Sequence, residues 1–307
     1  MKIVIAGGTG FIGRHVSRLL IHEGHSVTLL SRHTPDGKHL VNIQARHIQW
    51  DGCTQGTWAQ ECDGADVVIN LSGAPIADKR WTPSRKRELI HSRVVSTRTL
   101  GHAIARWKSK PHTFLTASGI GYYGDQGSKI VDEMSPRGDG FLADLCLEWE
   151  NAAQQIEATG LRVLDVRFGM VLGPDGGALS KMTLPFRIFL GGTILPGTQY
   201  VSWIHQQDLA RLILFLITHP SIRGPVNAVA PDAVTMKDFC DALGKAMKRP
   251  SLFPVPEFVL KIALGELATM LTTGQRVHSQ KALSTGFSFT YSTVQGALNS
   301  LFAQPSA

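Results

Sequence analysis

The chain lacks the long apolar run that a membrane-spanning helix needs. Its longest apolar helix candidate, residues 257–271, contains Lys261 and Glu266 and is too short and too charged to cross a bilayer. Residue 1 leads directly into a strand pattern, without the basic stretch and apolar core of a signal peptide. We therefore expect no membrane insertion and no export, and we expect a cytoplasmic protein.

The chain is also poor in cysteine and has no concentrated basic tract. Its four cysteines form no C-x-x-C pair, which favours free thiols over disulfides or zinc, so we expect no metal site. Its net charge is +7, but the lysines and arginines are spread along the 307 residues. The densest basic run, residues 79–93, is typical of a solvated helix start beside an anionic cofactor. Nucleic-acid binding ranks last, because it would need a stripe of positive charge.

Apolar residues, in contrast, make up 43% of the chain, enough for a full core. Short apolar runs predict strands at residues 2–6, 26–30, 66–73, 113–118, 161–169 and 224–230. Helical patterns lie between them, chiefly at residues 83–105, 141–158 and 206–217. This alternation predicts an α/β fold: a doubly wound parallel (Rossmann) sheet with a smaller, mostly helical C-terminal substrate region.

The texture of the sequence changes after Gly169. We expect residues 1–170 to form an NADP-binding Rossmann domain, whose sheet also takes in about residues 203–230. Residues 171–307 would form the substrate-binding region, with a helical tail from about residue 256. Its first part is turn-rich, which is typical of loops that reach over the carboxyl edge of a sheet.

The stretch IVIAGGTGFIG carries the strongest local signal. Gly7, Gly10 and Gly13 follow a strand directly and open a helix, which is the context that a dinucleotide-binding turn requires. Gly7 permits the tight turn, Gly10 lets the backbone approach a pyrophosphate, and Gly13 allows close packing of the helix. We predict that these glycines, with Phe11 and Ile12 between them, bind the cofactor through the helix N-terminus.

The end of the second predicted strand indicates which cofactor is bound. An NAD-binding protein usually places Asp or Glu there, against the ribose hydroxyls, but this chain has Ser31 and Arg32. A guanidinium at this position can stack on adenine or pair with a 2′-phosphate. We therefore predict NADP (NADPH), with Ser31 and Arg32 as cofactor-binding residues; the alternative is a surface arginine at a strand end.

Five segments together resemble the extended short-chain dehydrogenase/reductase superfamily: GGTGFIG, INLSGAPIADKRW, TASGIGYYGD, VRFGMVLGPDGGAL and SWIHQQDLA. They look most like its branch named for nucleoside-diphosphate-sugar epimerases, the epimerase family proteins. The likeness covers nearly the whole chain, including a helical tail at about residues 256–302 of the kind that this branch carries.

This resemblance implies further cofactor contacts after the strand at residues 66–73. It places Leu71, Ser72 and Gly73 along the adenosine and pyrophosphate. It also suggests that Glu88 and Arg93, on the following helix, approach the cofactor, with Arg93 as a second phosphate partner. From the residues alone, Glu88 and Arg93 could equally be a solvated helical pair.

The resemblance does not extend to all the catalytic residues of the superfamily. Working members of the superfamily use a Tyr-x-x-x-Lys pair with a Ser or Thr, and the ammonium brings the phenol pKa near neutrality. The helix that should carry the pair, residues 141–158, contains no Tyr, Lys or Arg. Ser118 matches the hydroxyl position, and Tyr122 is an extra phenol that could face the nicotinamide, so these two are the candidate catalytic residues. Tyr123 resembles a non-catalytic Tyr-Gly turn.

Other polar residues lie near the predicted crevice. Asp132 and Glu133 could meet a substrate hydroxyl, although a solvated loop is the simpler interpretation. Four residues of the loops over the sheet edge could line a substrate pocket: Lys181, Gln199, Trp203 and His205. The segment at 202–205 could equally be a core strand, with Trp203 and Ile204 pointing inward and His205 hydrogen-bonded to a backbone carbonyl.

Two hypotheses for function follow. The first is an NADP-dependent oxidoreductase or epimerase with an atypical active site, which acts on a small carbonyl or sugar-nucleotide-like substrate with proton transfer by Ser118, Tyr122 or water. The second is a non-catalytic NADP-binding sensor or regulatory protein. A polar crevice at the nicotinamide would favour the first, and one filled by Phe141 and Leu142 would favour the second. Pairing of exposed helices into a homodimer stays open.

Overall fold

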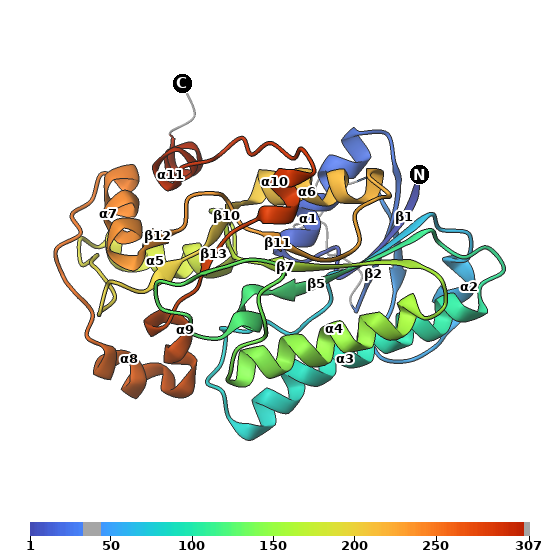
Figure 1. The fold of residues 1–307 in the computed structure, drawn as a ribbon, viewed down its shortest axis with the longest axis horizontal. Coiled ribbons are helices and arrows are strands. Elements are labelled where there is room, and N and C mark those ends of the chain that lie inside the picture. The colour runs from blue at the N-terminus through green and yellow to red at the C-terminus, as the bar shows by residue number, and fades with distance from the viewer. Residues whose placement is uncertain (33–43, 304–307) are drawn as a thin grey trace.

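The computed structural model describes residues 1–32 and 44–303, in which seven strands form one parallel sheet. The spatial order is β11-β7-β5-β4-β1-β2-β3. Strands β2 and β3 therefore lie on one side of β1, and the strands from β4 onward lie on the other side. The predicted doubly wound fold is confirmed (Figure 1). The strands are β1 (Lys2–Ala6), β2 (Ser26–Ser31), β3 (Arg46–Gln49), β4 (Val67–Asn70), β5 (Thr113–Gly119), β7 (Arg162–Phe168) and β11 (Gly224–Ala228).

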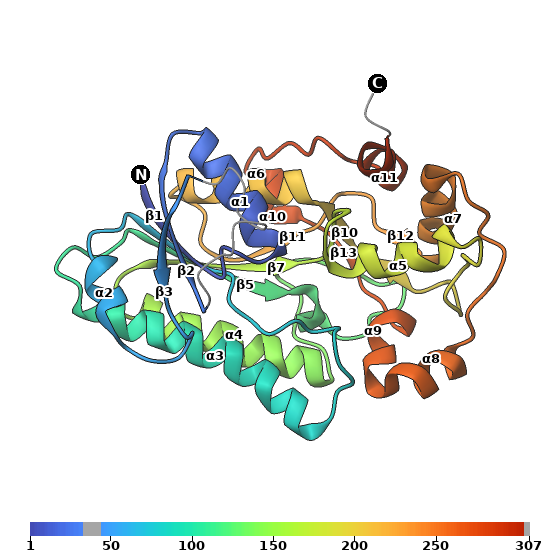
Figure 2. The same ribbon diagram turned by 180° about the vertical axis from the view of Figure 1, so that it is seen from behind.

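Helices cover both faces of this sheet. On one face α1 (Phe11–His22) packs beside α6 (Gln206–Thr218), and on the other α3 (Pro83–Arg106) packs beside α4 (Phe141–Glu157) (Figures 1 and 2). The short α2 (Thr57–Glu61) lies near the β3 edge. β1 shows why a central strand reads as a continuous apolar run: Ile3 and Ile5 enter the core under α1 and α6, while Val4 and Ala6 enter the core under α3 and α4.

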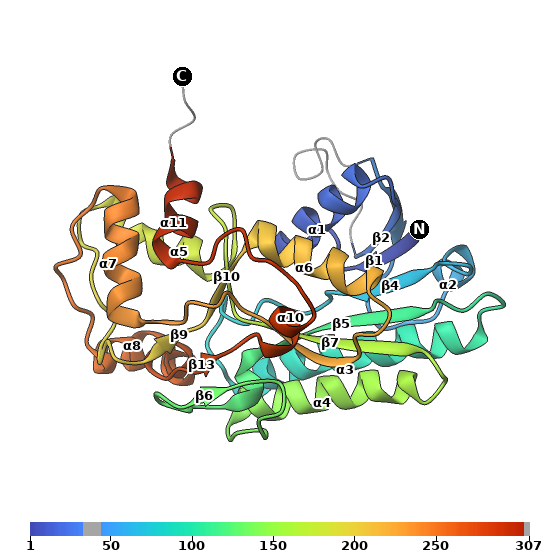
Figure 3. The ribbon, with the colours of Figure 1, turned by 45° about the horizontal axis from the view of Figure 1, so that its top comes forward.

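Most of the C-terminal region gathers at one end of the sheet, around short two-stranded ladders, while α10 (Gln280–Ser284) packs against β11 of the sheet (Figure 3). Its helices are α5 (Gly177–Arg187), α7 (Met236–Met247), α8 (Glu257–Leu264), η2 (Gly265–Ala268), α9 (Thr269–Thr272), α10 (Gln280–Ser284) and α11 (Val294–Phe302). Its ladders pair β8 (Met170–Leu172) with β10 (Trp203–His205), β9 (Tyr200–Val201) with β12 (Val234–Thr235), and β6 (Ile130–Val131) with β13 (Arg276–Val277). η1 (Ile120–Tyr123) follows β5 directly.

One ladder ties this region to the sheet, and a side-chain cap marks the start of α7. The β6–β13 ladder joins the loop after β5 to the C-terminal tail, so the tail is anchored beside the carboxyl end of β5. Thr235 caps α7 by accepting a hydrogen bond from Asp238 N. None of the helices described in residues 1–32 and 44–303 is long and apolar enough to cross a membrane.

The segment at 202–205 is a core strand, the second of its two interpretations. Trp203 and Ile204 of β10 are fully buried, and His205 is 1% exposed. His205 Nδ1 accepts a hydrogen bond from Gln207 N (3.1 Å), so the neutral ring carries its proton on Nε2, 3.4 Å from Ser300 Oγ. The expected partner, a backbone carbonyl, is therefore wrong: the imidazole caps α6.

Burial of His205 predicts a pH-dependent loss of stability. Burial lowers its pKa from 6.5 to about 4, so the unfolded chain binds more protons in this window, and stability is expected to fall as the pH drops from about 6.5 to about 4. Urea unfolding across this range measures the effect. His205→Asn keeps an acceptor for Gln207 N but cannot titrate, and should flatten the slope. An unchanged slope would show that other groups cause it.

Candidate cofactor and reaction site

The glycine turn lies where three neighbouring parallel strands end. Gly7 N donates to Leu30 O of β2 (3.0 Å), and Leu71 N, just after β4, donates to Ala6 O of β1 (2.8 Å). Gly7 has φ of +76°, and a Cβ there would lie 2.7 Å from Leu71 O, so the position requires glycine. The turn therefore lies at the switch point between β1 and β4, where doubly wound sheets bind their ligands.

The start of α1 fits an anion. Gly10 is the N-cap, no side chain caps the helix, and its first turn holds no acidic residue. A Cβ on Gly13 would lie 2.5 Å from Gly7 O, whereas one on Gly10 would lie 3.3 Å from that oxygen and meet no other described atom within 4 Å. Gly13 thus permits close packing of the helix, and Gly10 leaves room for a diphosphate to reach the amides of Phe11 and Ile12.

Ser31 and Arg32 lie beside this turn, because β2 ends next to Gly7. Ser31 is buried and its hydroxyl oxygen lies 2.6 Å from His47 Nε2, while Arg32 is exposed. The carboxyl of Glu88 on α3 has a lowered pKa, chiefly because Arg85 hydrogen-bonds it, and Arg32 contributes to the lowering. Arg32 is therefore within electrostatic reach of Glu88 on α3.

The segment after β4 runs along the same sheet edge. Ser72 N donates to Asn70 Oδ1 (3.1 Å), and a Cβ on Gly73 would lie 3.0 Å from Arg93 Cζ. Arg93 is 9% exposed, and its guanidinium donates to Ala74 O (3.1 Å) and to a carbonyl of its own helix. Burial lowers its pKa to about 10. A solvated helical pair is wrong for Arg93, whose guanidinium supports the segment; its contact with phosphate stays a prediction.

Ser118 lies at the end of β5 with its hydroxyl turned into a buried network. Its Oγ donates to Glu150 Oε1 (2.7 Å). The Glu150 carboxylate also accepts from Arg167 Nε (2.8 Å) and Nη2 (2.7 Å). Arg167 Nη1 donates to the Tyr123 hydroxyl (2.9 Å), which donates to Asn227 Oδ1 (2.8 Å). Each of these residues is buried, so the network fixes Ser118 in place.

Tyr122 is half-buried and lies against the same arginine. The guanidinium carbon of Arg167 is 3.5 Å from the centre of the Tyr122 ring, a stacked cation–π contact. No local sequence pattern indicates a cation near Tyr122, because Arg167 comes from β7, far along the chain. Tyr123, by contrast, is fully buried, and its burial raises its pKa to about 12. Tyr122 and Ser118 are thus connected through the ion pair of Arg167 and Glu150, because Tyr122 stacks on Arg167 and Ser118 donates to Glu150.

One face of α4 points at the turn after β5. Leu142 lies against Gly121, because a Cβ on that glycine would be 2.9 Å from Leu142 Cβ. One helical turn later the Cys146 thiol donates to Gly119 O (3.5 Å), and a further turn later Glu150 meets Ser118. A Tyr-x-x-x-Lys pair on this face would occupy the positions of Leu142 and Cys146. Burial raises the Cys146 pKa to about 11, so the thiol is neutral.

An apolar cluster surrounds Leu142. Trp81 packs edge-on against Phe141, with ring centres 5.0 Å apart, and Leu264 and Leu267 of the C-terminal tail complete the cluster. The tail is held there because Arg80 donates from Nε to Ala263 O (2.9 Å). The start of α4 thus faces apolar side chains of the β4–α3 loop and of the tail.

The remaining candidate residues support loops. Glu133 is buried and accepts hydrogen bonds from the backbone amides of Asn227 (3.0 Å) and Lys281, so a solvated loop is wrong for Glu133. Lys181 Nζ donates to Ala77 O (2.9 Å), which joins α5 to the β4–α3 loop. Gln199 is buried, and its amide donates to two backbone carbonyls.

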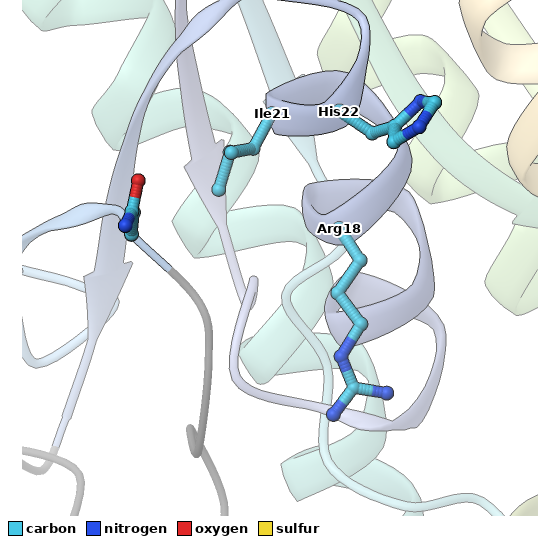
Figure 4. Close-up of a pocket in the computed structure, with 4 residues that line it drawn as sticks. Arg18, Ile21 and His22 are labelled. Carbon is cyan, nitrogen blue, oxygen red and sulfur yellow. The ribbon is translucent and has the colours of Figure 1, made fainter.

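A surface hollow beside the last turns of α1 is lined by Arg18, Ile21, His22 and Gln44 (Figure 4). It lies at the opposite end of that helix from the glycine turn and holds none of the predicted site residues. Within residues 1–32 and 44–303, no three His, Cys, Asp or Glu side chains come together as a metal site.

Comparisons with known proteins agree with this geometry. Residues 3–228 match the model of the NAD dependent epimerase/dehydratase family, and residues 255–301 match a domain of unknown function. Epimerase family protein YfhF of Bacillus subtilis is 40% identical over 99% of this chain and 98% of its own length. A chloroplastic SDR39U1 homolog of Arabidopsis thaliana is 37% identical over 98% of this chain and 86% of its own length.

Solved structures show the same relationship. Human epimerase family protein SDR39U1, crystallised with NADPH, superposes with a TM-score of 0.89 at 34% identity and covers 98% of this chain and 99% of its own. A UDP-glucuronic acid 4-epimerase from Bacillus cereus, with a TM-score of 0.79 at 17% identity over 98% of each chain, shares the fold alone. The resemblance read from the sequence motifs is confirmed: the chain belongs to the NAD dependent epimerase/dehydratase family, among the epimerase family proteins.

Proposed function

We propose that this protein is an NADPH-dependent oxidoreductase that reduces a small carbonyl compound without a Tyr-Lys pair. The observation that carries the proposal is the glycine turn at the β1/β4 switch point, where the N-terminus of α1 is uncapped and Gly10 leaves space for a diphosphate. The exposed Arg32 beside it suits a 2′-phosphate. The NADPH in the human relative's structure supports the same cofactor.

The chain's own residues then bind and orient the reactants. The amides of Phe11, Ile12 and Gly13 would hold the diphosphate, and Leu71 and Ser72 would lie along it. Bound NADPH supplies a hydride, and holding it against a carbonyl in a fixed geometry lowers the barrier without a side-chain acid. Tyr122 or water would supply the proton, since the Ser118 hydroxyl is bonded to Glu150.

This arrangement favours reduction over epimerisation. Epimerisation begins with oxidation of a hydroxyl, and a general base must then remove that hydroxyl's proton. Leu142 and Cys146 occupy the helix face where the Tyr-Lys pair would lie, and the Cys146 thiol is neutral and buried. A one-way reduction, in which the substrate only gains a proton, makes the smaller demand on these residues.

The second candidate function is a non-catalytic NADPH-binding protein. The apolar cluster around Phe141 and Leu142 favours it, because apolar side chains offer a sugar or hydroxy substrate no hydrogen bonds. In this case the tail, which packs on that cluster, would carry the cofactor-dependent signal to a partner. We propose a cytoplasmic location and no nucleic-acid partner in either case, and a homodimer stays open.

Two measurements separate these functions. Calorimetry with NADPH should show binding that Gly13→Val abolishes, because a side chain there would meet Gly7 O. Gly24→Ala adds a methyl that meets no atom within 4 Å but strains a backbone with a φ of +78°, so it is the control for destabilisation without a clash in the turn. Single-turnover oxidation of bound NADPH against a panel of carbonyl compounds then tests catalysis. Binding with oxidation by some compound supports the reductase, binding without any supports the sensor, and no binding contradicts both.

A further inference from the structure

We propose that the substrate of this site is an apolar α,β-unsaturated carbonyl compound, reduced at its C=C bond. The inference rests on the proposed NADPH-dependent reduction and names its substrate class. Two independent observations carry it: the side chains packed around Phe141 and Leu142 are mostly apolar, and the α4 face on which a Tyr-Lys pair would lie holds Leu142 and Cys146.

The first observation concerns what the substrate would touch. Leu142 lies against Gly121 in the turn after β5 and belongs to an apolar cluster formed by the β4–α3 loop, α3, the start of α4 and the tail. Its other members include Trp81, Leu89, Phe141, Leu264 and Leu267. Phe141 and Leu142 are only half-buried, so part of this apolar surface is accessible. Binding an apolar, planar molecule on such side chains lowers the free energy, whereas a sugar bound there would lose hydrogen bonds to water.

Most of the polar groups next to this surface are already bonded within the protein. Trp81 Nε1 donates to Ile76 O (2.9 Å), Arg85 donates to Pro75 O, and Arg93 donates to Ala74 O (3.1 Å). Lys86 Nζ, 4.9 Å from the centre of the Phe141 ring, pairs with Glu266. Arg85 Nε is buried without a hydrogen-bond partner. The other donors named here are bonded to carbonyls of the loop, and these bonds would have to break before the groups could hold substrate hydroxyls. A sugar nucleotide fits this surface poorly for the same reason.

The second observation concerns the proton. Hydride addition to an isolated ketone produces an alkoxide, a strong base that needs a proton donor as it forms. The buried Glu150 accepts the Ser118 proton in a hydrogen bond and cannot supply one, and Leu142 has no proton to give, which leaves the Tyr122 phenol and water as the candidate donors. Tyr122 lies on η1 and not on the α4 face where the usual acid would lie, so the site is matched to a substrate whose reduced form needs no acid at the moment of hydride transfer.

An α,β-unsaturated carbonyl meets this condition. Hydride, two electrons with one proton from the reduced nicotinamide, forms a C–H bond at the β-carbon of the substrate. The C=C electron pair becomes the new C=C bond of an enolate, and the carbonyl π pair moves onto oxygen. Delocalisation stabilises this anion, which then takes a proton from water at the α-carbon. NADP⁺ and the saturated carbonyl compound are the products, so atoms and electrons balance.

The test compares benzylideneacetone with benzylacetone, its saturated analogue, which differ only in the C=C bond. We expect NADPH oxidation with benzylideneacetone to be at least about 100-fold faster than with benzylacetone, the size that a missing general acid typically costs. The product should be benzylacetone, identified by mass spectrometry, and UDP-glucose should cause no oxidation. Faster turnover of a saturated ketone or of UDP-glucose would overturn the proposal.

Variants of α4 test the two observations separately. Leu142→Asn should weaken binding of benzylideneacetone to the NADP⁺-loaded protein by about tenfold, while NADPH binding stays unchanged; both are read by calorimetry. The double variant Leu142→Tyr/Cys146→Lys places the missing pair on the helix face and should raise benzylacetone reduction relative to benzylideneacetone. Unchanged enone affinity in Leu142→Asn would contradict the proposed apolar contact.

Failure of this inference and failure of the proposed function give different results. If NADPH binds and is oxidised only by unconjugated carbonyl compounds, the proposed oxidoreductase function is supported and the α,β-unsaturated substrate class is contradicted. NADPH binding without oxidation by any compound would remove both and leave the sensor. Arg32→Asp, assayed in parallel with the enone, reports whether the observed oxidation requires NADPH bound to the protein rather than free in solution.

Discussion

Arg32→Asp is expected to weaken NADPH binding by about 100-fold while changing NADH binding by less than about tenfold. The guanidinium lies at the end of β2, beside the glycine turn, where the 2′-phosphate distinguishes NADPH from NADH. The change removes a charge-assisted contact and adds repulsion between a carboxylate and that phosphate. NADH has a ribose hydroxyl there, which can donate a hydrogen bond to the new carboxylate.

Calorimetric titration of both cofactors measures this change in preference. Arg18→Asp on α1 is the matched control, because it makes the same change of charge on an exposed arginine that lies at the other end of the helix from the glycine turn. The comparison should be made at one low salt concentration, since exposed charges are screened. Equal losses of NADPH and NADH affinity in Arg32→Asp would remove the assignment of the 2′-phosphate to this residue.

The cofactor turn illustrates which structural features can be read from sequence. Gly7, Gly10 and Gly13 act through backbone geometry that is local, so their spacing after a strand is enough to predict the turn. The central strands were equally readable, because burial on both faces makes β1 and β4 continuous apolar runs. β3 was not predicted: it is an edge strand, and its sequence Arg-His-Ile-Gln carries one buried apolar residue.

For the reaction site, the sequence showed which residues are missing but not which contacts replace them. The sequence showed that α4 has no Tyr-Lys pair, but not that Glu150 of that helix would bind Ser118 and Arg167. Those partners come from β5 and β7, and no local pattern relates an acidic helix residue to a particular buried arginine. The same limit made Arg93 and Glu133 look like solvated residues, although tertiary packing buries both.

The tail shows a related limit. Its helical pattern and its extent, about residues 256–302, were visible in the sequence. An amphipathic pattern tells which residues are apolar, but not which surface they cover. In the structure Leu264 and Leu267 cover the start of α4, while Phe258 and Ile262 of α8 are exposed. The contact between the tail and the reaction site, on which the substrate proposal depends, therefore required the structure.

The ion pair between Glu150 and Arg167 is expected to give the largest effect of substitution on stability. Glu150→Leu would leave the Arg167 guanidinium, 4% exposed, without its carboxylate, and should lower the free energy of unfolding by about 3–5 kcal/mol. Arg167→Met should cost a similar amount, because it leaves a buried carboxylate unpaired. The double variant Glu150→Leu/Arg167→Met removes both charges and should recover much of the loss.

Urea unfolding of the three variants measures these differences, and Asp144→Ala is the control on the same helix. Asp144 pairs with Arg137 at the surface, with 57% and 33% of the two side chains exposed, so its loss should cost less than about 1 kcal/mol. A double variant as unstable as the sum of the two single ones would contradict the argument, because the loss would then come from packing and not from an unpaired charge. Recovery in the double variant would also separate the stabilising role of Arg167 from its role in the reaction. The variant would be folded, with the Tyr122 ring no longer stacked on a guanidinium and Ser118 no longer bonded to Glu150, so its rate of NADPH oxidation would measure the effect of the ion pair on these two residues together.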